Sequence, residues 1–354
     1  MSGEAVLVID VAGETLSPEE RARLASPVVA GVILFARNFS SRNQVEDLVA
    51  DIRRVNPSVL VMVDQEGGRV QRFCGAGFTR LPSMRALRLY CEEQPETGAD
   101  LVKDTGWLLA AELRSAGIDL ALSPVLDLDR GISEVIGDRA FSGNPEQVAQ
   151  LAGLLIAGMH EAGMASVGKH FPGHGGVALD SHTACPVDGR GSEEIQQDLL
   201  PFQSLLDSGG LDAVMMSHVV YTARDRHPAG FSSLWINRVL REEMGFDGAL
   251  FSDCLSMEAA RQAGSAQQRV GRALGAGCDA ALLCNSPSDV AQVIAALEKG
   301  EIVPGLDQTV RAGRLARLRG KAERVHTRSL LESSQRRQAV RQALQESGLW
   351  QHAM

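Results

Sequence analysis

Eight short, continuously apolar segments recur along this 354-residue chain. A strand with one solvent-facing side alternates apolar and polar residues, so an unbroken apolar run predicts a strand buried on both faces, as in a parallel sheet. The runs are residues 5–11, 31–35, 60–63, 120–123, 166–168, 213–216, 248–251 and 280–283.

Helical stretches separate these runs. Asn144 is expected to cap a helix that begins at Pro145 and stops at Gly163. Eight strand–helix alternations predict an α/β fold, a single-domain (β/α)8 barrel of the TIM type, with an open doubly wound sheet as the alternative. We assign residues 1–304 to the barrel and residues 305–354 to a C-terminal helical extension packed on or beside it.

The charge and composition of the chain limit the classes of partner that it is expected to bind. The net charge of −9 disfavours nucleic acid and anionic membranes, so a small-molecule substrate is expected. Residues 301–354 carry ten Lys and Arg against five acids, and we interpret this basic tail as solvated helix faces. No apolar run reaches the roughly 18 residues of a membrane span, and the N-terminus predicts no signal peptide. Six cysteines without a C-x-x-C pair indicate free thiols in a cytoplasmic protein, which we expect to be a monomer.

Polar residues directly follow most of the apolar runs. Catalytic residues of such barrels lie on the loops after the strands, so these positions are candidates, although each alone could equally cap the next helix. They are Asp64, Gln65, Glu66, Asp127, Asp129, Lys169, His170, Ser217, His218, Ser252, Asp253 and Asn285.

The segment KHFPGHGGVALDSHTACPVD, residues 169–188, holds the densest group of such residues. Its proline and glycines predict an irregular, mobile loop. A zinc pair of His170 and His174 would need a helix there, so no metal site is expected. Asp180 and His182 are two residues apart, which allows an extended backbone to direct a carboxylate toward an imidazole that moves protons. An incidental pair on a surface loop explains the same spacing.

Two further segments are ambiguous on spacing alone. In GALFSDCLSM, residues 248–257, Asp253 could be a nucleophile, a helix cap or a metal ligand. DQEGGRVQR, residues 64–72, is not a phosphate-binding loop, since no G-K-[ST] follows. Its neighbouring acids and guanidinium groups suit a hydroxyl-rich ligand or a surface ion pair.

Taken together, KHFPGHG with its following DSH, DQEGGRVQR and FSD-x-LSM resemble the β-N-acetylhexosaminidases of glycoside hydrolase family 3, most closely the single-domain bacterial enzymes of peptidoglycan recycling. The similarity runs from about Ile9 to Asn285 and fades in the tail. The resemblance implies a retaining β-N-acetylglucosaminidase without cofactor or metal. Its implied substrate is N-acetylglucosamine linked to anhydro-N-acetylmuramic acid, with or without peptide.

The resemblance also assigns roles by position. Asp253 matches the catalytic nucleophile, and His182 matches the acid/base, held by Asp180. The residues that match sugar-binding positions are Asp64, Arg72, Arg139, Lys169 and His170, with His218 near the reacting sugar. Cys254 departs from the family, which often has a second Asp there, and Met216–Ser217 replaces a Pro–Ala pair.

Other functions stay open at this point. A phosphorylase on the same scaffold would benefit from a neutral histidine, which does not repel phosphate. A metal-dependent barrel hydrolase could use His170, His174 and His182. A non-catalytic sugar-binding protein would result if Cys254 disabled the site.

Overall fold

The computed structural model describes residues 4–181, 184–320 and 327–349, and its main strands form two parallel sheets. Their orders are β12-β1-β2-β3-β6 and β11-β9-β7. Each predicted apolar run forms one of these strands. Their bounds are β1 Leu7–Asp10, β2 Val29–Leu34, β3 Leu60–Val63, β6 Leu120–Ala121, β7 Val167–Phe171, β9 Ala213–Met216, β11 Ala249–Phe251 and β12 Ala281–Leu282.

Isolated parallel bridges connect the edges of the two sheets. Val125, just after β6, pairs with Lys169 in β7, and Phe251 in β11 pairs with Ala280, just before β12. Both edges of the larger sheet therefore contact an edge of the smaller one.

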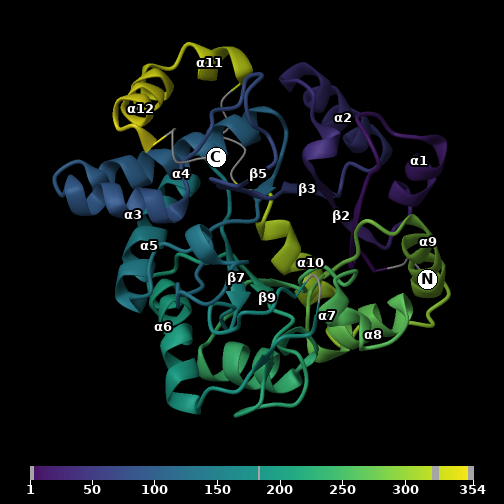
Figure 1. Cartoon of the computed structure of the whole chain (residues 1–354). Helices are drawn as coiled ribbons and strands as arrows, with labels where there is room; N and C mark the ends of the chain where they lie inside the picture. The colour runs from purple at the N-terminus through teal and green to yellow at the C-terminus, as the bar shows by residue number, and fades with distance from the viewer. Residues whose placement is uncertain (1–3, 182–183, 321–326, 350–354) are drawn as a thin grey trace.

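Helices lie around the strands (Figure 1). The predicted cap at Asn144 is confirmed, because its side chain accepts a 2.8 Å hydrogen bond from the Gln147 N–H. Gly163 follows that helix with a φ of 77°. Within the described part of the chain, no helix is both long and apolar enough to cross a membrane. The bounds are α1 Pro18–Leu24, α2 Arg42–Val55, α3 Met84–Glu93, α4 Gly98–Ser115, α5 Pro145–Glu161, α6 Ser192–Asp207, the π-helix η4 Leu234–Glu243, α7 Glu258–Arg261, α8 Ala266–Ala276 and α9 Pro287–Glu298.

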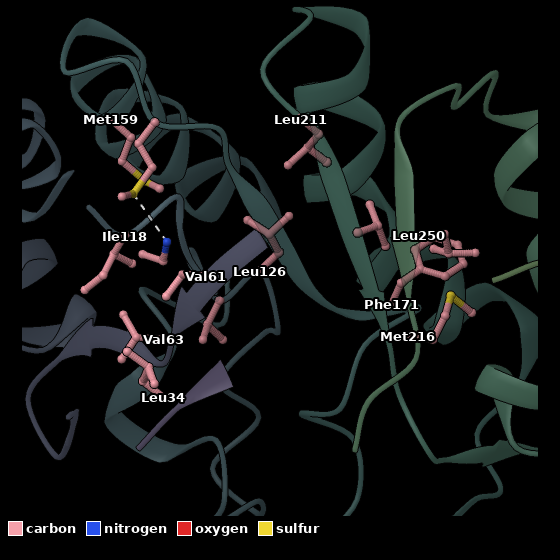
Figure 2. Packing of buried hydrophobic residues seen from close by; sticks show 14 of the residues in the cluster. Leu34, Val61, Val63, Ile118, Leu126, Met159, Phe171, Leu211, Met216 and Leu250 are labelled. Carbon is pink, nitrogen blue, oxygen red and sulfur yellow. Dashed lines mark hydrogen bonds between the residues drawn. The ribbon is translucent and has the colours of Figure 1, made fainter. Parts of the chain in front are cut away.

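The strands bury both faces, which explains their continuous apolar sequence. In β3, Val61 and Val63 belong to one hydrophobic cluster, which also contains helix residues, while Leu60 and Met62 belong to a second cluster. Figure 2 shows Val61 and Val63 in the first cluster near Ile118. Burying such a side chain contributes about 1.5–3 kcal/mol, so a polar residue on either face would be costly.

Short elements that the sequence did not predict shape the loops after the strands. β4 (Gln65–Gly67) and β5 (Val70–Gln71) form an antiparallel hairpin, and β8 (Val187–Asp188) pairs in parallel with β10 (Val220–Tyr221). Short 3-10 turns also occur at Ala36–Asn38, Gly137–Arg139 and Ala229–Phe231. β7 extends to Phe171, so Lys169 and His170 lie within the strand rather than after it as predicted.

The C-terminal helices are α10 (Gln308–Arg317), α11 (Arg328–Glu332) and α12 (Gln335–Glu346), and the last two pack against α4 (Figure 1). The interpretation of the basic tail as solvated faces is wrong for two residues. Arg311 is 1% exposed and pairs with Glu4, while Arg337 lies 2.8 Å from Glu112 and is 9% exposed. These guanidinium groups attach the tail to the rest of the chain.

Candidate active site

A cavity of about 800 Å³ opens where the carboxyl ends of the strands meet. His170 at the end of β7 lines it, together with residues that follow β3, β11 and β12, which include Asp64, Asp253 and Asn285. Its size is typical of a small-molecule site. Parallel strands present all their carboxyl ends at one edge, so segments distant in sequence meet here.

A buried charge network occupies one part of this site. The Lys169 Nζ lies 2.9 Å from the Asp64 carboxylate and 2.6 Å from that of Glu66. Arg139 donates two 2.9 Å hydrogen bonds to the Glu66 carboxylate, from Nε and Nη2. Arg72 approaches Asp64 at 3.6 Å. The Glu66 side chain is only 1% exposed. Its charged hydrogen bonds with Arg139 and Lys169 hold it in a single position.

The network remains ionised because its charges compensate burial. Burial by itself raises the pKa of Asp64, but Lys169 and Arg72 bring that pKa below its ordinary value. Burial also raises the pKa of Glu66, but the positive charges of Arg139 and Lys169 outweigh this effect, so the pKa of Glu66 lies far below its ordinary value. Burial lowers the pKa of Lys169, yet the two carboxylates raise it above its ordinary value. The site therefore presents fixed charges and hydrogen-bond donors to a ligand.

Asp127 organises the two histidines at the end of β7. Its carboxylate lies 2.7 Å from the His170 Nδ1 and accepts hydrogen bonds from the backbone N–H groups of His170, at 3.2 Å, and His174, at 2.6 Å. Burial raises the pKa of Asp127, and the nearby imidazoles lower it below its ordinary value overall. Burial and the adjacent His170 lower the pKa of His174, which keeps that ring neutral. Asp127 thus holds the His170 ring in one orientation.

Asp253 lies half-buried on the cavity wall just after β11, where its carboxylate accepts a 2.7 Å hydrogen bond from the Cys254 N–H. His218 does not line the cavity but is fully buried near Asp253, with its ring stacked on Phe231 at 5.4 Å. Burial lowers the pKa of His218, and the Asp253 carboxylate counteracts this only in part. His218 is therefore a neutral ring beside the Asp253 carboxylate.

The loop after β7 contributes Asp180 and Ser181 to the cavity wall. Ser181 anchors this loop, because its hydroxyl lies 3.1 Å from the His174 Nε2 and its carbonyl accepts the Ala259 N–H. His182 lies outside the described residues, so its predicted role is not addressed by this geometry.

The structure brings most of the candidate residues into one place. The cavity is lined by Asp64, Arg72, Arg139, Lys169, His170, Asp180 and Asp253. The resemblance assigns no role to Glu66 and Asp127, although both are acids that follow predicted strands. Their partners Arg139 and His170 stand 73 and 43 residues away in sequence, a separation that no local pattern reveals.

The metal-hydrolase alternative also requires His182, which lies outside the described residues. Across residues 4–181, 184–320 and 327–349, no group of three or more His, Cys, Asp or Glu side chains is arranged to hold a metal ion. His170 and His174 are instead engaged by Asp127 and Ser181.

Known proteins resemble this chain along nearly its whole length. The model of the glycosyl hydrolase family 3 N-terminal domain matches residues 4–318. A β-hexosaminidase of Methylococcus capsulatus is 47% identical over 334 residues, covering 94% of this chain and 97% of that protein. One from Pseudomonas aeruginosa is 48% identical over 316 residues, covering 89% and 91%. The crystal structure of NagZ from Neisseria gonorrhoeae in complex with N-trifluoroacetyl-D-glucosamine has a TM-score of 0.88 at 39% identity, covering 98% of both chains.

Proposed function

This chain belongs to glycoside hydrolase family 3 and is a glycosidase, and on that premise we propose that it is a retaining exo-β-N-acetylglucosaminidase. The β-hexosaminidase relatives support the activity, and the N-acetylglucosamine-like ligand of the Neisseria NagZ structure supports the sugar. The observation that carries the proposal is the position of Asp253 in a cavity that also presents Asp64, Arg139 and Lys169.

The proposed scaffold is one closed (β/α)8 barrel. The two bridges between the sheets support closure, as does the burial of alternate strand residues in separate clusters. Residues 1–304 form the catalytic barrel in this proposal, and residues 305–354 form the extension. The packing of α11 and α12 on α4 supports the placement of the extension beside the barrel.

The charge network is proposed to bind the non-reducing N-acetylglucosamine. Asp64 and Arg72 offer an acceptor and donors for sugar hydroxyls, and Lys169 and Arg139 add fixed donors. A ligand that meets pre-oriented charges avoids the entropic cost of ordering flexible side chains. His170, oriented by Asp127, completes the sugar-binding set, with His218 behind the reacting centre.

The proposed mechanism has two displacement steps. Asp253 attacks the anomeric carbon while His182 donates a proton to the leaving oxygen, which yields a covalent glycosyl-Asp253 ester. Water, deprotonated by the now neutral His182, then displaces Asp253 and releases the sugar with retained configuration. Asp180 is proposed to orient the His182 ring. A histidine replaces the second carboxylate used by most retaining glycosidases.

The proposed substrate is N-acetylglucosamine linked to anhydro-N-acetylmuramic acid, with or without peptide, as released in peptidoglycan recycling. A cavity of about 800 Å³ is large enough for the terminal sugar and part of the next unit. The charged rim, with Arg69 and Arg261 among its residues, suits the carboxylates of a peptide-bearing fragment.

Trapping of the intermediate tests the proposal. A slow fluorinated N-acetylglucosaminide should esterify Asp253, and mass spectrometry of the digested protein should locate the label there. A label on Asp64 or Asp180, which line the same cavity, would contradict the assignment. Products assayed with and without phosphate distinguish hydrolysis, which yields free sugar, from phosphorolysis, which yields sugar 1-phosphate.

A pair of variants separates the two catalytic roles. Acid–base assistance contributes roughly 10²–10⁴-fold, and a good leaving group needs little of it. His182→Ala should therefore keep much of its first-step rate on a nitrophenyl glycoside, whereas Asp253→Ala should not. Equal losses in both variants on that substrate would refute the division of roles.

A further inference from the structure

Cys254 and Cys284 meet on the cavity wall beside Asp253, and nothing in the glycosidase mechanism uses either thiol. Both cysteines are free, and their side chains are hydrogen-bonded to each other. We propose that Cys254 and Cys284 form a reversible oxidation site, which hydrogen peroxide converts to a disulfide that inactivates the enzyme. The effect on activity rests on the proposed role of Asp253, whereas disulfide formation does not.

The main chain already holds the two cysteine-bearing segments side by side. The Ser252 N–H donates to the Ala280 carbonyl at 3.1 Å, and the Leu255 N–H donates to the Leu282 carbonyl at 2.8 Å. The Ser256 hydroxyl donates to the carbonyl of Cys284 itself at 2.6 Å. The segments that carry the two cysteines are therefore in direct contact, and both cysteines line the same cavity.

The two thiols have complementary chemical roles. The hydrogen bond with Cys284 lowers the pKa of Cys254 below its ordinary value, while the same bond and burial raise the pKa of Cys284. A thiolate attacks peroxide, and a neighbouring thiol resolves the product. Cys254 is partly exposed to the cavity, so a small oxidant can reach it, whereas Cys284 is 1% exposed.

The reaction balances with peroxide as the only oxidant. The Cys254 thiolate attacks one peroxide oxygen and the O–O bond breaks. The hydroxide that leaves takes up the proton lost by the Cys254 thiol, which gives one water and a sulfenic acid on Cys254. The Cys284 sulfur then attacks the sulfenic sulfur, its proton leaves with the hydroxyl as a second water, and the S–S bond forms. Two thiols lose two electrons, and one peroxide is reduced to two waters. Dithiothreitol reverses the change by thiol–disulfide exchange.

A disulfide here would disturb Asp253 through the backbone. The Cys254 N–H donates the 2.7 Å hydrogen bond that orients the Asp253 carboxylate. Drawing the Cys254 sulfur from hydrogen-bonding contact to a covalent S–S distance of about 2.05 Å shifts this segment. A misplacement of about 1 Å costs roughly 10²-fold in rate, so we expect at least a tenfold loss of turnover.

The test oxidises the reduced full-length enzyme with hydrogen peroxide and then reads the thiols and the activity separately. Trypsin should release residues 242–261, which contain Cys254, linked to residues 273–299, which contain Cys284. Fragmentation must separate Cys284 from Cys278 on the second peptide, and Cys278 is fully buried. The expected result is a Cys254–Cys284 cross-link, two fewer free thiols and a loss of turnover that dithiothreitol restores.

Variants control for unspecific oxidation, each compared with its own reduced activity. Cys254→Ala and Cys284→Ala should resist peroxide, whereas Cys185→Ala should lose activity like the wild type, because Cys185 lies outside this cavity. Peroxide that yields only sulfenic or sulfinic acid on Cys254 overturns the disulfide. If the cross-link forms without loss of turnover, the claim that the disulfide displaces Asp253 is refuted. A reduced enzyme without turnover refutes the proposed function instead, and the cross-link still tests the disulfide.

Discussion

The substitution Glu66→Gln should destabilise the protein because it removes the anionic centre of the buried charge network. Glu66 compensates two cations, since it accepts two 2.9 Å hydrogen bonds from Arg139 and lies 2.6 Å from the Lys169 ammonium. Glutamine keeps one acceptor oxygen but directs an N–H group at a cation. Breaking a buried ion pair costs about 3–5 kcal/mol. Because the glutamine oxygen still accepts a hydrogen bond, we expect a loss at the lower end, about 3 kcal/mol of unfolding free energy.

Urea denaturation at neutral pH, followed by the fluorescence of the buried Trp107 and Trp235, measures this loss. The pH dependence supplies a second test. The folded-state pKa of Glu66 is depressed, so its stabilisation is complete above the unfolded-state pKa of about 4.3 and is lost as pH falls toward the folded value. The difference between wild type and Glu66→Gln should therefore shrink below about pH 4.3.

Glu92→Gln is the matched control for this prediction. Glu92 also pairs with an arginine, Arg88, but its side chain is 46% exposed. Exposed pairs contribute about 0–1 kcal/mol, so this variant should remain close to the wild type. Equal stabilities of Glu66→Gln and Glu92→Gln would refute the argument that the network compensates buried charge.

Two other substitutions test the histidines of the site. Asp127→Asn should lower kcat/KM roughly 10²-fold through misorientation of His170, and steady-state kinetics that match the wild type would contradict this. His218→Phe should change how stability depends on pH: burial lowers the folded-state pKa of His218, so the wild type loses stability as pH falls below its unfolded-state pKa of about 6.5. Between pH 7.5 and 5, the unfolding free energy of the wild type should fall relative to that of His218→Phe. If the unfolding free energies of the two proteins change with pH in parallel, the His218 ring is not buried in its neutral form.

Local sequence carried most of the information on the elements. The runs at 60–63 and 213–216 coincide with β3 and β9, because a strand buried on both faces must be apolar throughout. The helix cap at Asn144 follows from one side chain and the next three residues. The hairpin of β4 and β5 was missed, since strands of two or three residues leave no measurable periodicity.

The site was predictable as a set of positions but not as a network. Asp64 and Asp253 were identified by family motifs and by their place after apolar runs. The pairing of Lys169 with Glu66 required the tertiary structure, because both residues carry charges that a surface loop would equally accommodate. Their burial, which turns an ordinary ion pair into a structural requirement, is set by the packing of distant segments.

The amino-acid sequence by itself determined which segments form the eight main strands, where several helices begin, and which acids follow the strands, since these depend on side-chain polarity over a few residues. Only the tertiary structure decided that Asp127 holds His170 and that Cys254 meets Cys284. The physical reason is that contacts between segments dozens of residues apart depend on strand order and register, which many local patterns satisfy equally well. Such contacts are therefore fixed only when all the strands have packed together in one order and register.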